Sequence, residues 1–71
     1  MISPVPKPGV IIRAGDIVTL RNWDDSVCRR LILLVNPERD LVVEQDLENG
    51  EMMRGSLAVM TYEVIKIMEA N

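Results

Sequence analysis

The sequence predicts an all-β fold, a small five-stranded barrel or meander, from three observations. Short apolar runs recur along the chain and are separated by Gly, Pro, Asn and Asp, which is the pattern of strands and turns. The runs are rich in Val, Ile and Leu, whereas aromatic residues make up only 3% of the chain. Several runs alternate apolar and polar residues with a period of two.

The 71 residues are enough for one domain, which would remove only about 60% of its unfolded surface from water. Its first segment, "SPVPKPG", has proline at every second position and therefore disfavours strand pairing. We expect residues 1–12 to form an extended, loosely held Pro-rich arm and residues 13–71 to form a single small barrel-like domain.

The first strand of the domain is expected in "DIVTLRN", residues 16–22. Val18 and Leu20 fall on one face of this strand, and Thr19 and Arg21 fall on the other. The following "WDDS" is typical of a polar turn, because Asp and Ser side chains bond to the nearby backbone.

A hairpin is predicted over residues 28–47, where "CRRLILLV" and "LVVEQDL" flank the turn-forming "NPERD". A loop over residues 36–40 places Arg30 opposite Asp46, an oppositely charged pair across the strands.

A second hairpin is predicted over residues 41–57, with the chain reversing at Asn49 and Gly50. Gly50 is expected in the left-handed conformation of a type I turn with a G1 bulge. That register places Glu44 opposite Arg54.

The C-terminal stretch "SLAVMTYEVIKIMEAN" fits two interpretations. The favoured one is a short turn near residues 56–60 followed by a strand over residues 61–68, because β-branched residues dominate its second half. The alternative is an α+β fold, in which a helix over residues 57–69, N-capped by Ser56, covers a β-meander.

The order of a first strand beginning at "AGDIVTL", a three-stranded meander, a turn and a last strand resembles an SH3-like small barrel. The resemblance covers about residues 13–68 and implies a small barrel there. A peptide-binding SH3 domain has a groove rich in Tyr, Trp and Pro, and this chain has too few aromatic residues to build one.

The composition excludes several kinds of site. The chain has no histidine, so neither a Ser/His/Asp nor a Cys/His catalytic group is available. Cys28 is the only cysteine, which excludes a disulfide and leaves almost no ligands for zinc. We therefore expect no catalytic residues, no metal and no cofactor.

A lone thiol suits a reducing compartment, so we expect a cytoplasmic protein. No apolar run approaches the roughly 20 residues that span a membrane. The net charge of −3 disfavours nucleic acid and anionic lipid as partners.

These exclusions leave a non-enzymatic protein-interaction or adaptor module as the expected function. Trp23 lies between turn-forming and charged residues, the composition of an interface hot spot with a polar rim. The expected partner-binding residues are Arg21, Trp23, Asp24 and Asp25. The alternative interpretation is that Trp23 covers one end of the core.

We also expect the module to self-associate, because Ile32, Leu34 and Val42 are predicted to cluster on the face away from the core. A second possible function is a nucleic-acid-associated barrel that uses a strip of arginines, Arg29, Arg30 and Arg54. The competing interpretation is that these arginines pair with Glu44 and Asp46. The least favoured possibility is a small oligomeric enzyme with a pocket between subunits.

Overall fold

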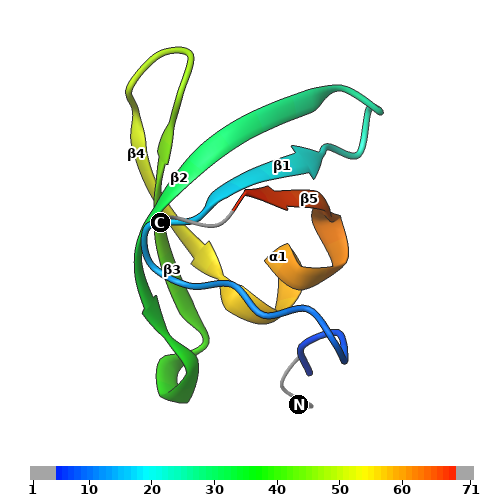
Figure 1. Ribbon diagram of the computed structural model, residues 1–71, viewed down its shortest axis with the longest axis vertical. Coiled ribbons are helices and arrows are strands. Elements are labelled where there is room, and N and C mark those ends of the chain that lie inside the picture. The colour runs from blue at the N-terminus through cyan, green and yellow to red at the C-terminus, as the bar shows by residue number, and fades with distance from the viewer. Residues whose placement is uncertain (1–4, 69–71) are drawn as a thin grey trace.

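The structure, a computed structural model, describes residues 5–68, which form a five-stranded antiparallel sheet and one short helix (Figure 1). The strands are β1 (Ile17–Arg21), β2 (Val27–Asn36), β3 (Leu41–Asp46), β4 (Met52–Ser56) and β5 (Val64–Met68). A 3-10 helix, η1 (Pro37–Arg39), joins β2 to β3, and helix α1 (Leu57–Glu63) joins β4 to β5. The predicted small β-rich fold is confirmed.

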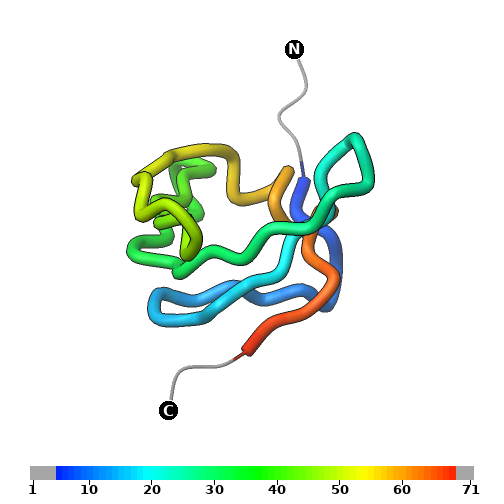
Figure 2. Tube along the Cα trace, turned by 90° about the horizontal axis from the view of Figure 1, so that it is seen from above, coloured from blue at the N-terminus to red at the C-terminus, as the bar shows by residue number. Residues whose placement is uncertain are grey.

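The strand order is β4-β3-β2-β1-β5, and every neighbouring pair is antiparallel. The sheet curls around the core, and α1 lies across its open side between β4 and β5 (Figures 1 and 2). Within residues 5–68, β4 and β5 do not pair, so the sheet is not closed into a barrel. Both strands therefore remain edges of an open sheet.

The core lies on the inner, concave face of the sheet and is built from aliphatic side chains and one methionine. Its buried members are Ile12, Val18, Leu20, Ile32, Val42, Leu57 and Met60. Val18 and Leu20 share the inner face of β1, as predicted, because alternate residues of a strand point to the same side.

The segment before β1 is attached to the domain near its end, although most of residues 5–11 are exposed. Ile12 is 6% exposed and belongs to the core, and the Lys7 amide donates to the Thr61 hydroxyl of α1 at 2.8 Å. The predicted arm is therefore not free of the domain, because the burial of Ile12 and this hydrogen bond hold it there. Residues 1–4 of the predicted arm lie outside the described residues.

The predicted β2–β3 register is right near the open end of the hairpin and wrong near its turn. Arg30 lies opposite Asp46, as expected, but the register shifts between Ile32 and Leu34, so Leu34 faces Val43. Leu33 is the extra residue of a β-bulge. The bulge reverses the inward and outward positions in the rest of β2.

The predicted β3–β4 register is wrong by one residue, since Glu44 faces Met53 and Arg54 faces Val43. Gly50 has the expected left-handed φ of 76°. The turn is one residue longer than expected because Asp46 organises it: its carboxylate accepts the amides of Glu48 at 2.8 Å and Asn49 at 3.2 Å.

The C-terminal segment combines parts of both predicted arrangements. The helix begins at Leu57 with Ser56 as its N-cap, whose hydroxyl accepts from the Val59 amide at 3.1 Å. It ends at Glu63, and β5 then pairs with β1, so neither a helix over 57–69 nor a strand starting at 61 is formed. Residue 69 lies outside the described residues.

Asp40, at the end of the β2–β3 loop, ties that loop to the start of α1. Its carboxylate accepts from the Ser56 hydroxyl and from the Ala58 amide, the latter at 2.8 Å, and its carbonyl accepts from the Leu57 amide at 3.2 Å. The Ser56 hydroxyl, and then the Ala58 amide, hold the pKa of Asp40 below its ordinary value of 3.8. The charged form of Asp40 is therefore favoured in the folded state.

This lowered pKa predicts a specific effect of acid. The contribution of Asp40 to the free energy of unfolding is present above the unfolded pKa and is lost as pH falls through the folded pKa. As pH falls below about 4, we expect the free energy of unfolding of Asp40→Asn to decrease less than that of the wild type. Urea unfolding at a series of pH values measures this difference. Glu38→Gln, at an exposed position of η1, is the control, and an Asp40→Asn profile parallel to the wild type would contradict the expectation.

Candidate functional site

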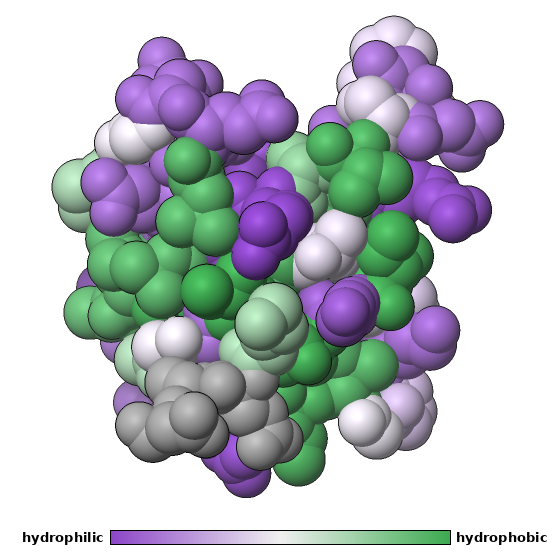
Figure 3. Space-filling view, turned by 45° about the horizontal axis from the view of Figure 1, so that its top comes forward, coloured by the Kyte–Doolittle hydropathy of each residue, from purple (hydrophilic) through white to green (hydrophobic). Residues whose placement is uncertain are grey.

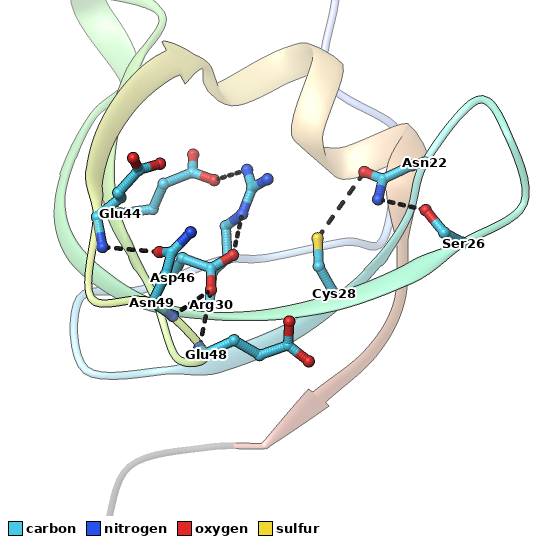
Figure 4. Close-up of polar contacts among 9 residues, drawn as sticks. Asn22, Ser26, Cys28, Arg30, Glu44, Asp46, Glu48 and Asn49 are labelled. Carbon is cyan, nitrogen blue, oxygen red and sulfur yellow. Dashed lines mark hydrogen bonds and ion pairs between the residues drawn. The ribbon is translucent and has the colours of Figure 1, made fainter.

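The turn between β1 and β2, residues 22–26, is held by local hydrogen bonds (Figure 4). The Asn22 amide donates to the Ser26 carbonyl at 2.8 Å, the Asp25 amide donates to the Asn22 carbonyl at 3.0 Å, and Asn22 Nδ2 donates to the Ser26 hydroxyl at 2.9 Å. Asp25 has a φ of 67°, a left-handed conformation that Asp tolerates better than most residues. The turn has a defined shape without a partner.

Asp24 takes part in holding this turn. Its Oδ1 accepts from the Ser26 hydroxyl at 2.6 Å and from the Ser26 amide at 3.0 Å. The hydroxyl, and then the amide, lower the pKa of Asp24 below its ordinary value. One oxygen of this predicted partner-binding carboxylate is therefore engaged within the turn.

Trp23 stands on this turn with its side chain in solvent, at 97% exposure. The interpretation that it covers one end of the core is wrong, because a covering side chain would be largely buried. A tryptophan normally buries much of its large apolar surface. Trp23 is instead an exposed aromatic residue on a rigid support.

An open hollow of about 430 Å³ lies beside Trp23. We call its lining the hairpin-tip surface; it consists of Arg21, Asn22, Trp23, Asp25, Tyr62, Glu63 and Ile65. Tyr62 is 60% exposed and Ile65 is 50% exposed. The chain has one tryptophan, one tyrosine and no phenylalanine, so both of its aromatic residues lie on this one surface.

Three of the four predicted partner-binding residues, Arg21, Trp23 and Asp25, line the hollow, whereas Asp24 does not. Sequence reasoning missed Tyr62 and Ile65, which reach the site from α1 and the start of β5 through the pairing of β5 with β1. The one available signal was that Tyr62 is the only other aromatic residue.

Apolar surface is also exposed outside the hairpin-tip surface. Figure 3 shows the tips of the β1–β2 and β3–β4 hairpins as hydrophilic projections at the two upper corners, with hydrophobic surface between them. The exposed hydrophobic residues include Val27 and Leu34 of the central strand β2 and Met52 of the edge strand β4.

The predicted arginine strip is divided between the two faces of the sheet. Arg30 points inward, where its guanidinium pairs with Glu44 and lies 3.9 Å from Asp46 (Figure 4). Arg29 and Arg54 are exposed on the outer face. The cross-strand pairing expected for the arginines is confirmed for Arg30, which is therefore not available as a nucleic-acid contact on the outer face.

The predicted oligomer interface is also divided. Ile32 and Val42 are 1% and 0% exposed in the core, whereas Leu34 is 46% exposed on the opposite face. Their expected common face is wrong because the bulge at Leu33 reverses the side to which Leu34 points. Ile32 and Val42 therefore stabilise the fold of a single chain and are not available to a second copy. Self-association stays a prediction, but these two residues cannot form its interface.

Residues 5–68 contain no group of three or more His, Cys, Asp or Glu side chains placed to hold a metal ion. None of the helices in this part of the chain is both long and apolar enough to cross a membrane. In comparisons with known proteins, no family model, no curated protein and no solved structure matched the chain significantly.

The exposure of Trp23 predicts that its removal leaves the fold intact. We expect Trp23→Ala to change the free energy of unfolding by no more than about 0.5 kcal/mol, as for other exposed substitutions. Ile32→Ala, in the core, should cost about 2–5 kcal/mol. Urea unfolding followed by circular dichroism measures both, and a loss of several kcal/mol in Trp23→Ala would contradict the exposed position.

The inward ion pair gives a second prediction. Arg30→Met leaves the Glu44 carboxylate, whose side chain is 4% exposed, without its partner, so we expect a loss of about 3–5 kcal/mol. The double variant Arg30→Met/Glu44→Leu should recover much of this loss, because it removes the buried charge as well. Arg29→Met, at the neighbouring outward position, is the control. If Arg29→Met and Arg30→Met had equal effects, a stabilising role for the Arg30–Glu44 pair would be excluded.

Proposed function

We propose that this chain is a non-enzymatic interaction module that binds another protein through the hairpin-tip surface. The observation that carries the proposal is the placement of both aromatic residues, Trp23 and Tyr62, in solvent around one hollow. A small domain gains stability by burying aromatic side chains. Here the core contains neither aromatic residue, and both are left for contact with another molecule.

The composition of the hairpin-tip surface supports a protein partner. Tryptophan, tyrosine and arginine are the residue types most enriched among binding hot spots. Arg21, Asp25 and Glu63 add charges of both signs around the aromatic pair, which resembles the polar rim of a protein interface. A long polyanion would meet two carboxylates here, so this surface favours a protein over nucleic acid.

The rigidity of the turn supports tight binding. The hydrogen bonds among Asn22, Asp24 and Ser26 hold the backbone on both sides of Trp23 before any partner arrives. Binding then orders little beyond the side chains themselves, which lowers the entropic cost of association.

The architecture that we propose for this module is an opened relative of the SH3-like barrel. The strand order β4-β3-β2-β1-β5, with a short helix before the last strand, supports this proposal. We also propose a cytoplasmic location, on the ground that Cys28 has no second cysteine to pair with.

The experiment compares what immobilised variants retain from an extract of the host. For a partner that binds the wild type, we expect Trp23→Ala and Tyr62→Ala each to weaken binding by about 2 kcal/mol or more, which is roughly a thirtyfold loss of affinity. Val59→Ala replaces an exposed apolar residue of α1 outside the hollow and should leave binding unchanged.

Circular dichroism of each variant separates loss of binding from loss of fold. A partner whose affinity is unaffected by both aromatic substitutions, in variants that remain folded, would exclude the hairpin-tip surface as its binding site.

A further inference from the structure

Charge is sorted between the two faces of the sheet. The strands contain two acidic residues, Glu44 and Asp46, and both point inward. Of the five cationic strand residues, only Arg30 points inward. The register places the other four on the outer face: Arg21, Arg29, Arg54 and Lys66. A chain of net charge −3 thus has a sheet face to which its strands contribute cations and no carboxylate.

The same face carries an apolar row that crosses the sheet. Ile17 of β1 lies between Met68 of β5 and Leu31 of β2, and the row continues through Gln45 to Met52 of β4. Met68 and Met52 are 49% and 65% exposed. Leu34 and Val43, paired across β2 and β3, widen the apolar area.

Cations border this row on both sides. Arg29 and Lys66 each lie opposite Thr19, two residues along β1 from Ile17, and Arg54 lies beside Val43 on the other side of the row. An apolar strip flanked by positive charges is complementary to a segment that alternates acidic and apolar residues.

We propose that the outer face of the sheet is a docking surface for an acidic segment of a partner protein that also carries apolar side chains. The methionines and Leu34 receive the apolar side chains, and the arginines and Lys66 receive the carboxylates. Unbranched methionine side chains adapt to differently shaped neighbours, which suits a surface that accepts a linear segment. This surface shares Arg21 with the hairpin-tip surface. The cations that border the apolar row are Arg29, Arg54 and Lys66, none of which lines the hairpin-tip hollow, so the proposal does not depend on the proposed function.

A second copy of the chain fits this face poorly. A two-fold interface places the same patch on both sides, so the four cations of each subunit would face those of the other. Like charges brought together in an interface oppose association.

Nucleic acid and anionic membranes fit less well than an acidic segment. Stacking of single-stranded bases needs aromatic side chains, and the chain's two, Trp23 and Tyr62, lie on the hairpin-tip surface. A membrane is a plane wider than the sheet, so it would also approach the acidic turns at Asp25 and Glu48, whereas a short segment contacts the face alone.

The test uses a fluorescently labelled peptide that alternates glutamate with leucine, titrated with the full chain and followed by anisotropy. We expect saturable binding that weakens as salt rises, because exposed charges are screened. Arg29→Glu/Arg54→Glu should weaken binding about tenfold or more, and Leu34→Ser should weaken it severalfold. Arg39→Glu, an exposed cation on η1, and Trp23→Ala should leave it unchanged, and circular dichroism checks that each variant is folded.

Control probes decide between this partner and the others. A glutamate-serine peptide should bind at least severalfold more weakly, and poly(dT) and phosphatidylglycerol vesicles should bind more weakly than the glutamate-leucine peptide. The proposal is overturned by equal binding of the serine peptide, by tighter binding of poly(dT) or vesicles, or by an Arg39→Glu effect as large as that of the double variant. It is also overturned if wild-type dimers, seen by sedimentation, dissociate in Leu34→Glu, because a second copy then covers the face.

Discussion

The bulge at Leu33 in β2 determines which side chains enter the core and which remain outside. β2 is the longest strand and lies at the centre of the sheet, paired with β1 on one edge and β3 on the other. Before the bulge, Arg30 and Ile32 point inward; after it, Val35 packs against the core and Leu34 faces solvent. In a regular strand without the bulge, Leu34 would point into the core and Val35 would point outward, because alternate residues face opposite sides. The inner core and the outer face therefore both depend on one inserted position.

Four of the eleven acidic residues hold turns and loops of the chain. Asp16 accepts the Arg13 amide at 2.9 Å, Asp24 holds the β1–β2 turn, Asp40 ties the β2–β3 loop to α1, and Asp46 holds the β3–β4 turn. Each carboxylate satisfies backbone amides that have no partner within a strand. Short loops of this kind replace part of the stability that a small core cannot supply. Negative charge accumulates at the ends of the strands as a result, and the outer face of the sheet is left positive.

Local patterns were predictable from the sequence, and their combination in space was only partly so. The alternation of Val18 and Leu20, the left-handed Gly50 and the N-cap at Ser56 each depend on a few adjacent residues. The β3–β4 register failed because the bonds of Asp46 set the turn length, which the Asn-Gly pair alone does not specify. In β2, the apolar run over residues 31–35 has no polar residue to mark where a bulge inverts its faces. Trp23 was predicted as a candidate binding residue from its neighbours in the sequence. Its placement beside Tyr62 depends on the pairing of β5 with β1, a contact between distant segments.

The pairing of β1 with β5, near the two ends of the described residues, also determines when the core can be completed during folding. The Lys7 amide bonds to a hydroxyl 54 residues later, and β1 acquires its second neighbour only in β5. During synthesis, Ile12, Val18 and Leu20 leave the ribosome well before Leu57 and Met60, the residues that cover them. The meander of β2, β3 and β4 contains contacts of shorter range and has no such delay. The core can therefore be completed only after α1 and β5 have emerged. Until then, Ile12, Val18 and Leu20 remain exposed and can contact other molecules.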